Sequence, residues 1–184
     1  DFPERVIPEF PQSREVTLAD KPLFDAVFAA RPPELSAYTF TNIFAWREVY
    51  GTSVSRLAEH LLVLHDHDGR CRCLEPLGDP PIAPVMEEVF SQSSRVSAFE
   101  RVSSSVVSEL RSPRLVPEPD RDNWDYLYFA EDMISLAGRR YDAKRNHIAK
   151  ARAAAAWEYV KLDGQTALEC EEFAEYWCED RQCE

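Results

Sequence analysis

The order of strand and helix patterns between residues 14 and 118 constrains the fold more than any other feature of this sequence. Short apolar or alternating runs are typical of strands, and apolar residues repeated every three or four positions are typical of helices. One strand pattern leads into two helices, the first with Asp20 near its cap and Pro22 in its first turn. A meander of three strands follows, with Asp68-Gly69 as a hairpin turn signal, and helices and strands then alternate.

This order predicts the α+β class, with a mixed, mainly antiparallel sheet flanked by helices. The expected elements after the first strand are a helix from residue 20, a helix over 38–50, strands over 53–58, 60–65 and 70–76, a helix over 80–90, a strand over 97–102, a helix over 103–110 and an edge strand over 113–116. A chain of 184 residues is long enough for one such domain and part of another.

Beyond residue 118 the same order of elements begins again. The aromatic and acidic stretch RDNWDYLY (121–128) is interpreted as packing between domains, and a short helix after it ends at Gly138. A basic helix, a strand over 157–162 and an acidic helix over about 166–179 follow. We therefore expect a first domain over 1–135, a connector helix over 136–156 and the incomplete beginning of a second domain over 157–184.

The basic helix stands out because the chain as a whole is acidic. The formal net charge is −12, from 21 Lys and Arg against 33 Asp and Glu, yet residues 139–152 contain six basic residues and one acid. The candidates for binding phosphate, on tRNA or on an anionic lipid head group, are Lys144, Arg145, Asn146 and Arg152. The alternative is a linker helix whose cations balance the acidic protein around it. General DNA binding is not expected of a chain this acidic.

Three residues of the second expected helix are candidates for lining a pocket. Asn42 and Trp46 are four positions apart, so a polar group and an indole share one helix face, and Arg47 follows them. The alternative is that Trp46 packs in the core and that Asn42 is a buried amide whose hydrogen bonds are made within the protein.

No metal site and no transmembrane segment are expected. The run His65-Asp66-His67-Asp68 has the residue types of a ligand set, but the turn begins at Asp68, so a solvated hairpin tip is predicted. The five cysteines lack the paired spacing of zinc sites and are interpreted as reduced thiols of a cytoplasmic protein. No apolar run approaches the about 20 residues that a membrane helix needs.

Four stretches carry a resemblance to a known family: LADK (18–21), FTNIFAWREVYG (40–51), RDNWDYLY with the later LAGRRYDAKRNHI (136–148), and EYWCEDRQC (175–183). Together they resemble bacterial proteins related to the C-terminal domain of phosphatidylglycerol lysyltransferase. The resemblance implies tandem GNAT-like domains, as in the Fem peptidoglycan ligases, with this chain holding one GNAT-like unit and the start of a second. It also implies transfer of an amino acid or acyl group to a lipid, peptide or other amine or hydroxyl acceptor.

The sequence departs from the GNAT pattern at the phosphate-binding loop. A coenzyme A site needs backbone N–H groups in a glycine-rich loop after the fourth strand. Here residues 75–81 read EPLGDPP, with one glycine, two acids and three prolines that lack the N–H donor. We therefore expect no cofactor in this chain, no assigned catalytic residue, and an acyl-CoA or aminoacyl-tRNA donor bound elsewhere in the full-length protein. The alternative function is a non-catalytic GNAT-like module that binds a ligand or has a structural role.

Overall fold

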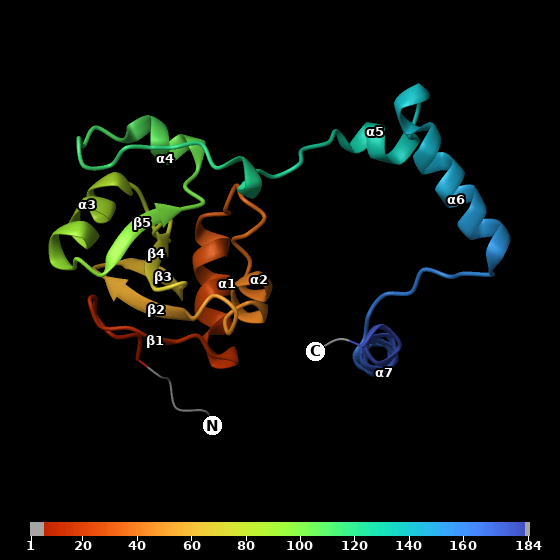
Figure 1. The fold of residues 1–184 in the computed structure, drawn as a ribbon, viewed down its shortest axis with the longest axis horizontal. Coiled ribbons are helices and arrows are strands. Elements are labelled where there is room, and N and C mark those ends of the chain that lie inside the picture. Colours follow the sequence, from red (N-terminus) through yellow and green to blue (C-terminus); the bar gives the residue numbers. More distant parts are fainter. Residues whose placement is uncertain (1–5, 183–184) are drawn as a thin grey trace. The chain divides into compact units, whose positions relative to one another are not determined.

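The computed structural model describes residues 6–182, which divide between Tyr126 and Leu127 into two compact units. The first unit contains a five-stranded sheet with helices, and the second consists of helices and connecting segments (Figure 1). The assignment of these units to the expected domains 1–135, 136–156 and 157–184 stays a prediction.

The sheet of the first unit runs in the order β1-β2-β3-β4-β5. Its strands are β1 (Arg14–Glu15), β2 (Thr52–Leu57), β3 (His60–His67), β4 (Arg70–Leu74) and β5 (Val96–Glu100). The first four strands pair antiparallel, whereas β5 pairs parallel to β4. Asp68 and Gly69 form the turn between β3 and β4, both with positive φ, as a two-residue hairpin requires. The predicted α+β class with a mixed, mainly antiparallel sheet is confirmed.

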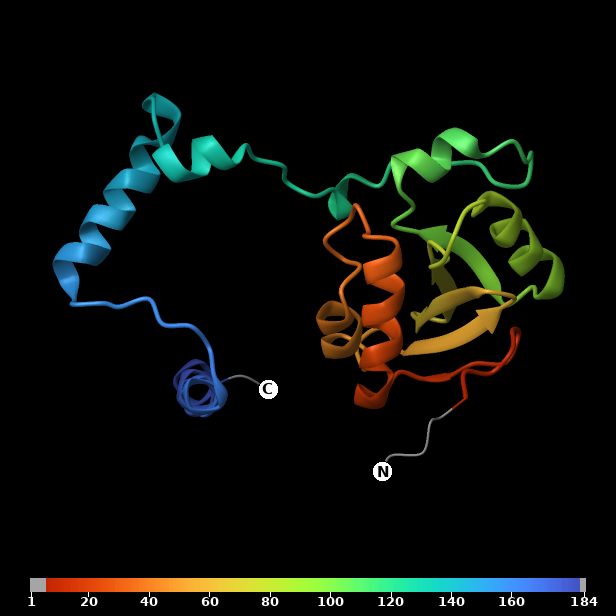
Figure 2. The same cartoon turned by 180° about the vertical axis from the view of Figure 1, so that it is seen from behind.

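Helices cover both faces of this sheet. They are α1 (Lys21–Ala30), α2 (Phe40–Ala45), α3 (Ala83–Gln92) and α4 (Ser104–Glu109), with short 3-10 turns at η1 (Leu18–Asp20) and η2 (Arg121–Asn123). Figures 1 and 2 place α1 and α2 on one side of the sheet and α3 on the other. The two faces follow from strand alternation: Leu61 and Val63 pack with the first pair of helices, and Leu62 and Leu64 pack with α3.

The first helical segment begins at a network around Asp20. This carboxylate accepts a hydrogen bond from the Thr17 N–H (2.8 Å) and pairs with Arg14 (2.6 Å). Asp20 is the N-cap residue of α1, as expected, but its side chain closes a capping box with Thr17 on η1 and makes no capping hydrogen bond to α1. The second helix is shorter than the expected 38–50, because α2 ends at Ala45 and turns continue to Gly51.

Two expected strands are wrong. Residues 113–116 have no strand structure, because Pro113 and Pro117 remove N–H donors from the ladder, and Leu115 is buried by packing alone. Residues 157–162 also form no strand, and their side chains are exposed. The described part of the second unit, 127–182, contains no strand that would serve as their partner.

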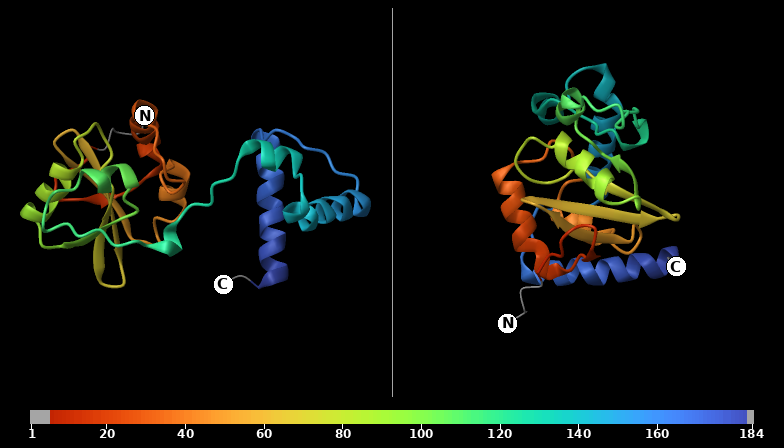
Figure 3. Two further views of the ribbon diagram at one scale, coloured as in Figure 1. Left: turned by 90° about the horizontal axis from the view of Figure 1, so that it is seen from above. Right: turned by 90° about the vertical axis from the view of Figure 1, so that its left-hand side faces the viewer.

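The second unit is built from α5 (Ala130–Ser135), the 3-10 turn η3 (Arg139–Tyr141), α6 (Asp142–Ala154) and α7 (Gly164–Arg181). These helices can be followed in Figure 3. Asp163 caps α7 by accepting hydrogen bonds from the N–H groups of Gln165 (3.0 Å) and Thr166 (2.9 Å). None of the helices within residues 6–182 combines the length and the apolar character needed to cross a membrane.

Candidate functional site

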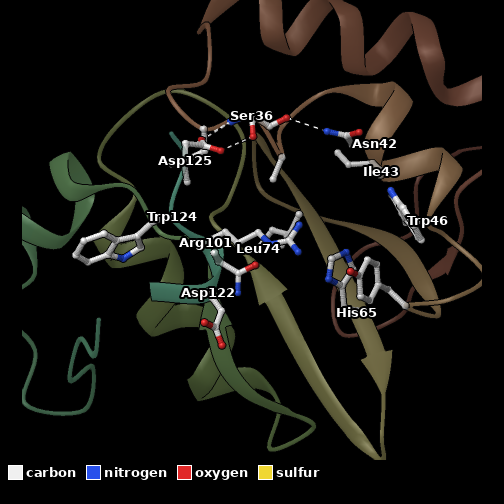
Figure 4. A pocket seen from close by; sticks show the side chains of 14 residues that line it. Ser36, Asn42, Ile43, Trp46, His65, Leu74, Arg101, Asp122, Trp124 and Asp125 are labelled. Atoms are coloured by element: carbon white, nitrogen blue, oxygen red, sulfur yellow. Dashed lines mark hydrogen bonds between the residues drawn. The ribbon is translucent and has the colours of Figure 1, made fainter. Parts of the chain in front are cut away.

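The first unit contains a cavity of about 280 Å³ beyond the ends of β4 and β5 (Figure 4). Its walls come from the segment before α2, from α2 and the turns after it, from β3, from the ends of β4 and β5, and from the segment around η2. The lining residues are Leu35, Ser36, Ala37, Asn42, Ile43, Trp46, Tyr50, His65, Leu74, Arg101, Asp122, Asn123, Trp124 and Asp125. These residues are a mixture of polar, aromatic and aliphatic side chains.

Arg101 directly follows β5 and extends its side chain into the middle of this cavity (Figure 4). Its backbone is left-handed, with φ of 54°, a conformation that costs a non-glycine residue about 1–2 kcal/mol. The guanidinium lies over the ring of Tyr50, 5.8 Å from the ring centroid. No hydrogen bond or ion pair to its guanidinium is found among residues 6–182.

His65 contributes a buried imidazole to the same cavity. It is 4% exposed, stacks on Tyr50 with centroids 5.0 Å apart, and places Nδ1 2.7 Å from Oε1 of Glu100. Burial raises the pKa of Glu100. The hydrogen bond from His65 and the charges of His65, Arg101 and Arg72 together lower it by more, so the pKa of Glu100 lies below its usual value. An ionised Glu100 can only accept a hydrogen bond, so Nδ1 of His65 carries the proton that it donates. The other ring nitrogen, Nε2, is then available to a group in the cavity.

The predicted hairpin tip is therefore wrong for His65. The physical reason is that His65 continues the apolar run Leu61–Leu64 of β3, where both faces of the strand are covered. His67, two residues later, is exposed beside Asp68, as expected for the tip. Within residues 6–182 no cluster of three or more His, Cys, Asp or Glu side chains is arranged to hold a metal ion.

One wall of the cavity is held by Asp125. Its carboxylate accepts hydrogen bonds from the N–H (2.8 Å) and the hydroxyl of Ser36, and these bonds lower the pKa of Asp125. The Ser36 carbonyl in turn accepts from the Asn42 side chain (2.9 Å). Residues 122–125 thus line a cavity within the first unit, and the packing between domains expected of the stretch 121–128 stays a prediction. Sequence reasoning missed this role because Ser36 and Asp125 are far apart along the chain.

The three predicted pocket residues divide into two groups. Asn42 and Trp46 both line the cavity, and Trp46 is 54% exposed, so it does not pack in the core. Arg47 does not line it: its guanidinium lies 4.1 Å from the Phe44 ring centroid, donates to the Phe44 carbonyl (2.9 Å) and pairs with Glu48.

The four predicted phosphate-binding residues all belong to α6 of the second unit. Arg145 is engaged internally, donating to the carbonyls of Leu136 and Gly138 and pairing with Asp142. The guanidinium of Arg152 lies 5.8 Å from the Trp157 ring centroid. Lys144 and Asn146 are exposed, without a side-chain hydrogen bond or ion pair in the described part of the chain. The described contacts of Arg145 thus match the alternative in which the cations of this helix balance charges within the protein.

The parallel strands β4 and β5 are joined at their ends by the hydroxyl of Tyr38. It accepts a hydrogen bond from the Glu75 N–H (2.8 Å) and donates to the Arg101 carbonyl (2.8 Å). Burial strongly raises the pKa of this phenol. Glu75 is 9% exposed and accepts from the Ser103 N–H (2.7 Å), with Arg31 3.8 Å away. The backbone groups at these strand ends are therefore already bonded within the protein.

The class that this fold defines is an α+β protein with a five-stranded mixed sheet, and a solved protein shares it. The crystal structure of a conserved protein of unknown function from Bacteroides thetaiotaomicron VPI-5482 aligns with a TM-score of 0.73 and 24% sequence identity. The alignment covers 97% of this chain and 61% of that chain, so the present chain spans about three fifths of that protein's length.

The family follows from the sequence match. A family model described as "Phosphatidylglycerol lysyltransferase, C-terminal" matches residues 28–184, and the chain belongs to this family. No curated protein matches the chain.

Proposed function

We propose that this chain is part of an aminoacyltransferase, in which the full-length protein moves an amino acid from aminoacyl-tRNA to a lipid acceptor. The observation that carries the proposal is the family match over residues 28–184. In such a reaction the acceptor hydroxyl or amine attacks the ester carbonyl of the donor, and N–H donors stabilise the oxyanion that forms. We assign no residue of this chain to this step and propose that the groups that perform it belong to another part of the full-length protein.

A GNAT-like fold for the first unit is supported by its topology. Two helices precede an antiparallel meander, β2-β3-β4, and α3 then leads to β5, which is parallel to β4. This is the order that the resemblance implies for an acyltransferase of the GNAT type. Because fold alone does not give activity, the site at the end of β4 decides what the unit can bind.

The first unit is proposed to lack a coenzyme A site, and the backbone donors after β4 support this. In residues 75–81 three prolines have no N–H, the Glu75 N–H is bonded to Tyr38, and the Leu77 N–H is bonded to the Leu61 carbonyl at 2.9 Å. Pro84 occupies the first turn of α3, where phosphate-binding loops usually offer donors. The buried Glu75 carboxylate adds a negative charge that repels phosphate.

The basic helix α6 is proposed to contact the phosphates of tRNA or of anionic lipid. Arg145 is held by its own unit, so Lys144, Asn146 and Arg152 are the residues of the original four that we assign to this contact. Their exposure supports the assignment, because the cations Lys144 and Arg152 can exchange counterions for phosphate without first breaking an internal ion pair, and the Asn146 amide can donate a hydrogen bond.

The proposal is tested with the full-length protein, aminoacyl-tRNA carrying a labelled amino acid, and vesicles with or without phosphatidylglycerol. We expect label in the lipid fraction only when tRNA donor and anionic lipid are both present. Replacing the donor by free amino acid with acyl-CoA should give no product. If the protein binds the vesicles but transfers no label from any aminoacyl-tRNA, the non-catalytic alternative holds and the proposal fails.

A further inference from the structure

We propose that the cavity around Arg101 is a binding site for a small organic anion, a carboxylate or a phosphate monoester attached to a body of about one ring. Nothing in the family description assigns such a site. The inference concerns the first unit alone and does not depend on the transfer reaction.

The charge of the site comes from Arg101. Its guanidinium lies in the cavity without a hydrogen bond or ion pair from any residue between 6 and 182, although it carries five donors in a planar fork. A guanidinium of this kind recognises a carboxylate or phosphate by paired hydrogen bonds. The left-handed backbone of Arg101 is held by the Tyr38 hydroxyl on its carbonyl, so the side chain is directed into the cavity at a cost in backbone energy.

The acidic residues near the cavity make no hydrogen bond or ion pair to this guanidinium in the described part of the chain, although the charge of Arg101 helps to lower the pKa of Glu100 and of Asp125. Glu100 is engaged by His65 at 2.7 Å and lies 3.9 Å from Arg72, and Asp125 is engaged by Ser36. Asp122 lies on the exposed wall, where solvent screens its charge. The Arg101 fork is therefore free for an anionic ligand.

The body of the ligand follows from the aromatic walls and the volume. Trp46 is 54% exposed, and its ring lies 6.4 Å from that of Tyr50, measured between centroids. The faces of such rings hold planar or apolar groups. A cavity of about 280 Å³ is just below the size range of sites for drug-sized ligands, so it suits a single ring or a small side chain.

His65 and Asn42 supply the remaining polar contacts. His65 is fixed by Glu100 through Nδ1, which directs Nε2 to the cavity, and Asn42 is fixed through its donation to the Ser36 carbonyl. Both side chains are held in place before a ligand arrives, and this lowers the entropy cost of binding.

The test uses calorimetric and NMR titrations of the 184-residue chain with benzoate, phenyl phosphate and benzamide. Benzamide has the shape of benzoate without its charge. We expect at least one anion to bind about tenfold or more tightly than benzamide and to shift the Trp46 indole N–H signal, since hydrogen bonds to charged groups contribute this much. The ratio of benzoate to phenyl phosphate affinity distinguishes a carboxylate ligand from a phosphate ligand.

The variants are Arg101→Gln and Arg101→Gly, with Arg114→Gln as an exposed control in the same unit. Both Arg101 variants should lose about tenfold or more in affinity for the anion, while Arg114→Gln binds like the wild type. Glycine accepts the positive φ at this position, so Arg101→Gly keeps the test valid even if Arg101→Gln is unstable. Equal binding of benzamide and the anions, absence of anion binding, or full affinity in Arg101→Gly would each overturn the proposal.

Discussion

The hydroxyl of Tyr38 makes one hydrogen bond to the chain just after β4 and another to the chain just after β5. These strands are parallel neighbours, and their continuations separate at this point. The hydroxyl satisfies the Glu75 N–H and the Arg101 carbonyl, which are backbone groups that strand pairing no longer serves. A single buried atom therefore links the two strand ends and holds the backbone of Arg101.

The role of this hydroxyl predicts the effect of Tyr38→Phe. Removing the hydroxyl leaves a buried N–H and a carbonyl without their partner, and each such loss costs about 1–3 kcal/mol. We expect the free energy of unfolding to fall by about 2–4 kcal/mol in urea denaturation. The control is Tyr126→Phe, whose ring is exposed and whose loss of a hydroxyl should change little. A Tyr38→Phe protein as stable as the wild type would contradict the role given to this hydroxyl.

The second residue-scale prediction concerns acid sensitivity. The pKa of Glu100 in the folded protein lies below its ordinary value of 4.5. Its ionised form therefore adds stability above the pKa of the unfolded chain, and this contribution is lost as the pH falls through the lower, folded pKa. Thermal unfolding of Glu100→Gln should accordingly be less sensitive to pH than that of the wild type below about pH 5. If the unfolding temperatures of the two proteins change with pH in the same way, Glu100 does not contribute to the acid sensitivity. Asp20, also with a lowered pKa, keeps its own acid sensitivity in both proteins.

At the scale of elements, the sequence predicts regular patterns well and isolated contacts poorly. The meander β2-β3-β4 follows from alternation and from Asp68-Gly69, because both signals lie within a few residues of the turn. The strand expected at 157–162 is wrong, because an apolar run becomes a strand only beside a partner strand. Of the residues that line the cavity, Asn42 and Trp46 could be predicted from their helical spacing. Arg101 and His65 could not be predicted as cavity residues, because their roles depend on contacts between segments that are far apart in the sequence.

The third prediction separates the cations of α6. Arg145→Gln removes the donation to the Gly138 carbonyl, so we expect a loss of about 1 kcal/mol in stability of the second unit, seen as reduced helical circular dichroism. Lys144→Gln should leave the helical signal unchanged. In the full-length protein, Lys144→Gln should weaken binding to tRNA or anionic vesicles and lower the salt slope by about one for each lost phosphate contact. Unchanged affinity and salt slope would make α6 purely structural.

At the scale of the whole molecule, buried side chains are distributed unequally between the two units. All three hydrophobic clusters belong to the first unit, whereas in the described part of the second unit the buried hydrophobic side chain is Tyr141. Stability from apolar burial should therefore reside in the first unit. Helices without tertiary packing are marginal in water, even at the 18-residue length of α7.

The fourth prediction follows from this distribution. A fragment of residues 1–126 should unfold cooperatively, with a midpoint within about 5 °C of the 184-residue chain, because it keeps every cluster. Amide exchange in the 184-residue chain should be slowest in β3 and fast in α5, α6 and α7. A fragment that fails to fold, or slow exchange throughout α7, would contradict the unequal distribution.

The central proposal is that Tyr38, Glu75 and the prolines of 75–81 leave the segment after β4 unable to bind the phosphates of coenzyme A. The most direct test is a calorimetric titration of coenzyme A into the 184-residue chain. We expect no saturable heat up to about 1 mM, a limit that corresponds to about 4 kcal/mol of binding free energy. Micromolar binding of coenzyme A would contradict the claim, because in residues 75–81 the three prolines lack an N–H and the N–H groups of Glu75 and Leu77 are already bonded, which leaves only those of Gly78 and Asp79 in this segment.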